Sequence, residues 1–85
     1  LVELVLTDNQ ITAFGAKALG EMLEKNSTLT VLVLHGNPLG DDGIGLLSRA
    51  LTTNRTLLEL KLTRTRTSDR GAEALAKLLR ENGTL

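Results

Sequence analysis

The sequence predicts an α/β fold: a right-handed βα solenoid with a parallel sheet on its concave side and helices on its convex side. The first observation is a repeat, because the 85 residues divide without gaps into units 1–28, 29–56 and 57–84, with Leu85 beginning a fourth. The second is that apolar residues alternate early in each unit and take helical spacing later. Equivalent strands joined through a helix run parallel, and such crossovers are right-handed.

The repeat rests on residues that recur every 28 positions. Leucines recur at three strand positions and two helix positions, a glycine lies between them, and asparagine and threonine close each unit. The recurring sets are Leu1, Leu29 and Leu57; Leu4, Leu32 and Leu60; Leu6, Leu34 and Leu62; Gly15, Gly43 and Gly71; Leu19, Leu47 and Leu75; Leu23, Leu51 and Leu79; Asn26, Asn54 and Asn82; and Thr28, Thr56 and Thr84. A unit with one strand and one helix cannot bury both apolar faces alone, so stacked neighbours must supply the core.

Each unit begins with a short strand. In the first unit, Leu1-x-x-Leu4-x-Leu6 ends in strict alternation. Alternation places Leu4 and Leu6 toward the core and sends the residues between and beside them out over the other face of the sheet.

A turn and the start of a helix follow each strand. The turns are Asp8-Asn9-Gln10 in the first unit and Gly36-Asn37-Pro38 in the second. Thr12 and Ser68 stand where an N-cap is expected. The helix dipole favours acidic residues in the first turn, where the sequence has Asp41, Asp42 and Asp69. The shared glycine falls in the same turn, and we interpret it as a point of close backbone approach.

The helix face that meets the sheet is narrow and rich in small residues, as expected for a helix pressed close to a sheet. Its predicted members are Ala16, Leu19, Gly20 and Leu23; Ile44, Leu47, Ser48 and Leu51; and Ala72, Leu75, Ala76 and Leu79.

Composition narrows the class of protein. Hydrophobic residues make up 41% and charged residues 24% of the chain, which is typical of a folded domain. Formal net charge is zero, so no overall field attracts nucleic acid or an anionic membrane. The absence of cysteine excludes disulfides, thiol nucleophiles and cysteine-based metal sites.

The stretches LVELVLTDNQI, LTVLVLHGNPL and LLELKLTRTRT resemble the leucine-rich repeat pattern L-x-x-L-x-L-x-x-N-x-L. The period of 28 and the tail GAKALGEMLEKNST are similar to the ribonuclease-inhibitor-like subclass, seen in ribonuclease inhibitor, NOD-like receptors, Ran GTPase-activating protein and tropomodulins. The third unit departs from the pattern at Thr65 and Thr67, so its turn is expected to be looser or differently hydrogen-bonded. The resemblance also implies that the recurring asparagine and threonine end each helix, rather than serving as glycosylation sequons.

The sequence contains few residues in patterns that could support catalysis. His35 is the only histidine, and no spacing suggests a nucleophile and an orienting acid around it. The glycine-rich run 40–45 carries two aspartates that would repel phosphate, and no lysine follows it. We therefore predict a protein that is not an enzyme and that has no cofactor and no metal.

The predicted site is a protein-binding surface on the concave face of the sheet. Val5 and Val33, with Val31 and Val2 nearby, are expected to form a small exposed apolar group inside a charged rim. Exposed valines are also simply good strand formers, so both interpretations stay open. The predicted partner-binding residues are Glu3, Val5, Thr7, Asp8, Val31, Val33, His35, Glu59, Lys61, Thr63 and Arg64.

Charge is unevenly spread along the stack. Counting each unit separately gives net charges of −2, 0 and +2. The basic turn Arg64-Thr65-Arg66, extended by Arg70, is either a solvated turn or a patch for an acidic partner or a basophilic kinase.

These observations predict a non-enzymatic scaffold that binds another protein, with no nucleic-acid or membrane partner, located in the cytoplasm. No polar capping unit is visible at either end, so residues 1–85 are expected to be a section of a longer array. From the resemblance, the first expected role is a segment of an intracellular receptor or regulatory protein. The alternatives are part of a GTPase-activating protein, or a cytoskeletal or actin-binding repeat domain.

Overall fold

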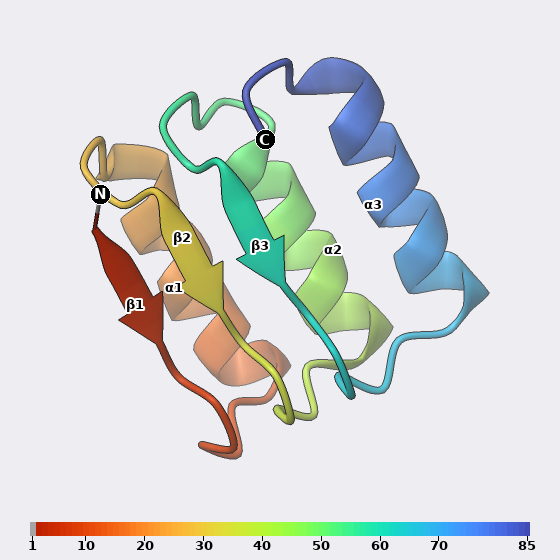
Figure 1. The fold of residues 1–85 in the computed structure, drawn as a ribbon. Helices are drawn as coiled ribbons and strands as arrows, with labels where there is room; N and C mark the ends of the chain where they lie inside the picture. Colours follow the sequence, from red (N-terminus) through yellow and green to blue (C-terminus); the bar gives the residue numbers. More distant parts are fainter. Residues whose placement is uncertain (1) are drawn as a thin grey trace.

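The computed structural model describes residues 2–85, in which strands and helices alternate strictly (Figure 1). The strands are β1 (Glu3–Val5), β2 (Val31–Val33) and β3 (Glu59–Lys61). The helices are α1 (Ala13–Lys25), α2 (Gly40–Leu51) and α3 (Asp69–Glu81). Leu1, predicted to begin the first strand, lies outside the described residues.

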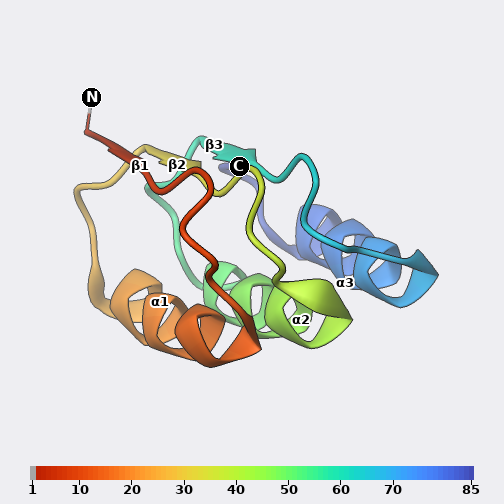
Figure 2. The same ribbon diagram turned by 90° about the horizontal axis from the view of Figure 1, so that it is seen from below.

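The three strands form one parallel sheet in the order β1-β2-β3, with Leu4, Leu32 and Leu60 in register. All three helices lie on one face of the sheet, and the crossovers between strands are right-handed (Figure 1). Seen from below, the helices spread farther apart than the strands, so the sheet is on the concave side (Figure 2). The predicted βα solenoid is confirmed.

The core is centred on the middle unit. Leu32, Leu34 and Leu51 are fully buried because a neighbouring unit covers them on each side. Their counterparts Leu4 and Leu60 in the outer units are only partly buried. Stacking rather than any single unit therefore supplies the core.

Helix α3 corrects one sequence expectation. Ala72, Ala76 and Leu79 were expected on the buried face, yet all three are exposed, and Leu79 is 61% exposed. Their counterparts in α2 are buried because α3 covers them. No described element covers α3 on the corresponding side, so this part of the predicted face stays open.

Asparagine side chains join each unit to the one before it. Asn54 Nδ2 donates to the carbonyl oxygen of Leu23 at 2.9 Å, and Asn82 Nδ2 donates to that of Leu51 at 2.7 Å. The Oδ1 atom of each asparagine accepts two backbone N–H groups of its own following turn. Asn26 and Asn82 are the C-cap residues of α1 and α3, as the resemblance implied, whereas α2 ends earlier, with Thr52 as its C-cap.

A second asparagine link joins the turn after β2 to the first unit, and it has no counterpart between the third unit and the second. Asn37 Oδ1 accepts the N–H groups of Asn9 and Ile11 at 2.9 and 3.1 Å, and its Nδ2 donates to Leu6 O at 2.8 Å. Thr65 stands at the equivalent place. Its hydroxyl bonds within its own unit, to Leu62 O and the Thr67 hydroxyl. Of the two expectations for this turn, different hydrogen bonding is confirmed.

The N-terminus of α3 is capped from the neighbouring helix. Asp41 Oδ1 accepts the N–H groups of Ser68 at 2.8 Å and Gly71 at 3.1 Å, and its other oxygen accepts the Ser68 hydroxyl. Gly71 must lack a side chain because a Cβ there would lie 2.7 Å from Asp41 Oδ1. Thr12 and Ser68 are confirmed as N-cap residues, although neither side chain caps its own helix. The hydrogen bonds from Ser68, then that from Gly71, and the nearby Arg70 charge hold the pKa of Asp41 below its ordinary value.

We predict that Asp41→Asn lowers the free energy of unfolding at neutral pH, because the carboxylate is favoured in the folded state. A depressed pKa gives stability that is present above the ordinary carboxyl pKa of about 4 and is lost as pH falls through the folded value. The gap between wild type and Asp41→Asn should therefore close in acid, as measured by urea unfolding across a pH series. Asp42→Asn, an exposed neighbour, is the control. A gap that does not change with pH would contradict this assignment.

We also predict that Thr65→Asn raises the free energy of unfolding by about 1 kcal/mol, because the asparagine can extend the turn link to the second unit. Chemical denaturation measures the change, and Thr63→Asn, at an exposed position of the same turn, should have no effect. If Thr65→Asn is no more stable than the control, the missing link is not what distinguishes this turn.

Candidate protein-binding surface

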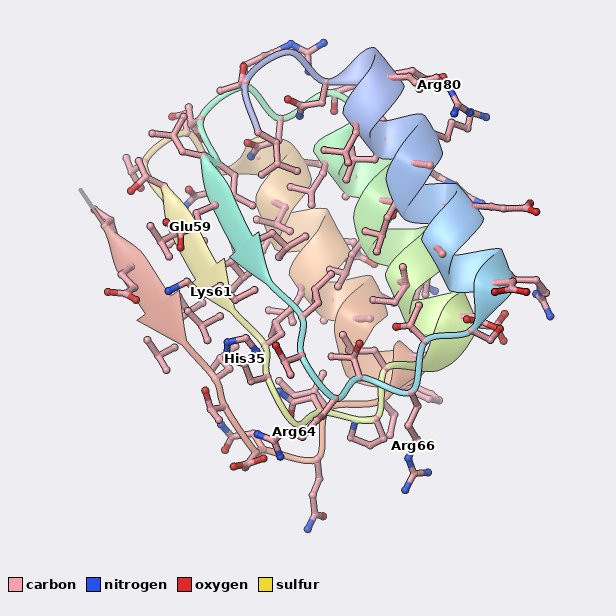
Figure 3. The ribbon with its side chains drawn as sticks, turned by 45° about the vertical axis from the view of Figure 1, so that its right-hand side comes forward. His35, Glu59, Lys61, Arg64, Arg66 and Arg80 are labelled. Carbon is pink, nitrogen blue, oxygen red and sulfur yellow. The ribbon has the colours of Figure 1, made fainter. Side chains whose placement is uncertain are left out.

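The residues predicted to bind a partner follow the strands and the turns after them, and Figure 3 shows Glu59, Lys61, His35 and Arg64 among them. Strand register aligns them in rows, and the backbone bonds from Asp8 N to His35 O and from Gly36 N to Thr63 O continue the rows past the strands. The rows are Glu3, Val31 and Glu59; Val5, Val33 and Lys61; Thr7, His35 and Thr63; and Asp8, Gly36 and Arg64.

The expected exposed apolar centre is wrong. Val31 and Val33 are only 8% and 6% exposed, although they lie on the outer face. They occupy the central strand, where Glu3 and Glu59 flank Val31, and Val5 and Lys61 flank Val33. The exposed apolar side chains lie instead on the flanking units: Val2, Val5 and Leu58 are each 50–57% exposed.

Charged side chains dominate what the surface presents. On β3, Lys61 Nζ lies 3.2 Å from Glu59 Oε2. Across the turns, Arg64 Nη1 lies 3.8 Å from Asp8 Oδ1. Both pairs are well exposed, so they contribute little to stability and their charges remain available to a partner.

Gly36 makes room for the Asp8–Arg64 pair. The backbone is left-handed at all three equivalent positions, with φ of 56° at Asp8, 73° at Gly36 and 59° at Arg64. A Cβ on Gly36 would overlap the Asp8 carboxylate and lie 3.4 Å from Arg64 Nη1. The sequence carried a signal for this bridge, since opposite charges occupy the same repeat position on either side of a glycine.

The backbone that follows β3 holds the His35 side chain in place. Its Nδ1 accepts the backbone N–H of Thr63 at 2.9 Å, so that nitrogen carries no proton here. In the neutral ring the proton is therefore on Nε2. His35 contributes a hydrogen-bond donor to the middle of the third row.

The basic turn does not form one patch. Arg64 faces Asp8, whereas Arg70 pairs with Asp42 on the helix side at 3.6 Å. Arg66 points away from the sheet face (Figure 3). The three arginines are close in sequence, but they belong to different surfaces.

The helix side of the molecule offers only open hollows among the described residues. Two open hollows of about 410 and 470 Å³ lie between α2 and α3, on the side away from the sheet face, and share Gly45, Arg49 and Ala74 in their lining. Within residues 2–85, no three His, Asp or Glu side chains gather in a way that could hold a metal ion. None of the helices described has the length and apolar character needed to cross a bilayer.

Comparison with known proteins agrees with this geometry. The family model described as "Leucine Rich repeat" matches residues 1–20, 25–48 and 53–76. Among solved structures, "Leiomodin-1 Actin-Binding Site 2 (ABS2)" is similar to the whole chain with a TM-score of 0.85 and 33% identity. The chain spans only 50% of the length of that structure. No curated protein matches the chain.

We predict that Gly36→Ala lowers the free energy of unfolding by about 2 kcal/mol, because it adds left-handed strain and displaces the Asp8 carboxylate. Gly40→Ala is the matched control. Gly40 has φ of 67° but open space where its Cβ would lie, so that variant carries the strain alone. Thermal and urea unfolding compare the two. Equal losses would contradict the close approach of Asp8 to Gly36.

Proposed function

This chain belongs to the leucine-rich repeat family, and from that premise we propose that it binds another protein through the concave face of its sheet. The three repeats would act as a section of a longer, non-enzymatic array. We further propose that the partner is a cytoskeletal protein, with actin as the candidate to test first, and that the array works in the cytoplasm.

The observation that carries the actin proposal is the similarity to the leiomodin-1 structure. The similarity covers all three repeats of this chain at 33% identity, and the matching structure is named for an actin-binding site. The chain spans half of that structure, so the actin proposal depends on the half that the chain matches. This favours the cytoskeletal alternative over the receptor role that the sequence alone suggested. The receptor and GTPase-activating roles, and the absence of a nucleic-acid partner, stay predictions.

The concave face supports recognition through charge. Lys61 and Arg64 lie on the third repeat, while Glu3 and Asp8 lie on the first repeat. A partner with an acidic segment over the third repeat and a basic one over the first would complement both ends. Complementary charges of this kind govern the association rate and the register of a complex more than its affinity.

The size of the face limits its affinity. Strands about 4.8 Å apart give three strands a width of roughly 15 Å, well below that of a standard interface. The face also lacks aromatic anchors, which dominate many binding hot spots. The three repeats alone should therefore bind weakly, and the affinity of a longer array should come from additional strands.

We predict that the double variant Lys61→Glu with Arg64→Glu weakens binding to purified actin at least tenfold. The variant should fold as the wild type does, because each substitution removes only a solvent-exposed ion pair. Binding is measured by titrating labelled actin with the chain at concentrations high enough to detect a weak complex, and circular dichroism checks the fold.

The control is Lys77→Glu with Arg80→Glu, which makes the same charge change in the same repeat but on the exposed surface of α3. This control should change affinity less than twofold. No measurable actin binding by the wild type would exclude actin as the partner. Binding that depends on Lys77 and Arg80 but not on Lys61 and Arg64 would exclude the concave face as the contact.

A further inference from the structure

We propose that Ser68 is a phosphorylation site for an arginine-directed serine kinase, and that the phosphate breaks the link between Asp41 and the third repeat. In the transfer, Ser68 Oγ attacks the γ-phosphorus of Mg²⁺-bound ATP. A new O–P bond forms, the bond to the leaving ADP breaks, and the hydroxyl proton passes to the catalytic aspartate of the kinase. This inference uses neither the concave face nor actin, so it is tested independently of the proposed function.

The sequence around Ser68 is basic on both sides. Arg66 precedes it by two residues, Arg70 follows it by two, and Arg64 lies farther upstream. Asp69 is the only acidic residue between Arg64 and Arg70. Protein kinases select substrates partly by the charges that flank the acceptor residue. This pattern therefore fits a kinase whose substrate groove is acidic.

The acceptor and its flanking arginines are accessible. Ser68, Arg66 and Arg70 are all exposed, and Arg66 points away from the sheet face (Figure 3). Arg70 is paired with Asp42, but the two side chains are 79% and 82% exposed. A pair this open contributes little to stability, so a kinase can take Arg70 from it at small cost.

Ser68 faces the second repeat, and a repeat placed after the third would leave it accessible. Its N–H and its hydroxyl both bond to Asp41 of the second repeat. Thr12 holds the equivalent position in the first repeat, and it is exposed although the second repeat follows it. The accessibility of Ser68 therefore does not depend on where the array ends.

Other hydroxyls fit such a kinase less well. Ser27 is exposed, but Lys25 is its nearest basic residue and no arginine lies beside it. Ser48 is only 6% exposed. Thr67 is exposed here, yet its counterpart Leu39 in the middle repeat is only 2% exposed. Among these residues, Ser68 alone combines arginines on both sides with exposure that a following repeat would preserve.

Phosphorylation changes the chemistry that Asp41 meets. Asp41 now accepts the Ser68 hydroxyl and the N–H groups of Ser68 and Gly71, so α2 supplies the cap of α3. A phosphoserine has no hydroxyl hydrogen left to donate, and it brings a charge of about −1.5 to −2 at neutral pH. Asp41 would therefore lose one donor and face a second anion at the same place.

The phosphate can replace Asp41 as the cap of α3. Ser68 is the N-cap residue, and Gly71 is the third residue of the helix. The N–H at this third position is one that an N-cap side-chain oxygen normally accepts. A helix N-terminus also favours a phosphate group, and Arg70 can pair with it once released from Asp42. Helix α3 would then keep a cap but lose its link to α2.

The break would be confined to one end of the helix pair. At the other end, Asn82 Nδ2 still donates to Leu51 O at 2.7 Å and to Asn54 O at 2.8 Å. The second and third repeats would therefore loosen beside the N-terminus of α3 and stay joined at its C-terminus.

The first test incubates the chain with an arginine-directed serine kinase, Mg²⁺ and ATP, and locates phosphate by peptide mass spectrometry. Ser68 should be modified about tenfold faster than Ser27, because only Ser68 has flanking arginines. Arg66→Gln with Arg70→Gln should slow modification of Ser68 by about tenfold. The control, Lys77→Gln with Arg80→Gln, removes the same charge from another part of α3 and should have no effect.

Ser68→Ala should take up no phosphate in this segment while keeping its circular dichroism spectrum. An absence of phosphate on Ser68 would overturn the site. A rate that does not change when Arg66 and Arg70 are replaced would overturn its recognition through arginine.

The second test compares urea unfolding of the phosphorylated and unmodified chains. Phosphorylation should lower the unfolding midpoint of the wild type by about 0.5 M or more, and should leave that of Asp41→Asn unchanged or higher, because the repelling carboxylate is gone. Asp42→Asn, which keeps Asp41, should retain most of the loss. A wild-type midpoint that does not fall would overturn the proposed release. So would equal losses in wild type and Asp41→Asn.

Discussion

The structure depends on contact between neighbouring repeats, because no repeat can cover its own leucines. The middle repeat shows the complete case, with Leu32, Leu34, Leu47 and Leu51 all at most 1% exposed. The counterparts of these leucines in the outer repeats are more open, except Leu23, which α2 covers and which is fully buried. Apolar burial supplies the drive to stack, while asparagines and Asp41 fix the register with bonds that only one arrangement can make. A slip of one residue would break those bonds and move the leucines out of the core.

The sequence was sufficient to predict the architecture, because the repeat relates equivalent positions along the whole chain. A spacing of 28 that holds at eight sets of residues determines which strands are neighbours, and it correctly predicted that Leu4, Leu32 and Leu60 share a register. It could not settle exposure at Val31 and Val33. Alternation decides which face a side chain points to, but flanking strands on both sides decide whether it is covered. It also treated the three helices as equal, although only α1 and α2 have a following helix to cover them.

The turns show where equal repeats stop being equivalent. Gln10 and Arg66 adopt left-handed backbone, with φ of 57° at both. The residue between them in the series is Pro38, whose ring fixes φ near −65° and excludes that conformation. After Gly36, the next left-handed residue in the second repeat is Gly40 instead, and α2 begins there, one position earlier in the repeat than α1 and α3. A single proline thus changes the path of the chain beside the concave face, and pairwise comparison of repeats would not show it without the backbone angles.

The concave face and the contacts between repeats differ in chemistry because they arise from different features of the repeat. The concave face takes its character from variable positions between the leucines, where charge differs from repeat to repeat. The contacts between repeats depend mainly on the recurring leucines and asparagines. Partner choice can therefore change through residues such as Lys61 and Arg64 without disturbing the stack. Conversely, residues such as Asp41, Asn37 and Gly71 control the stack without touching the surface that a partner would meet.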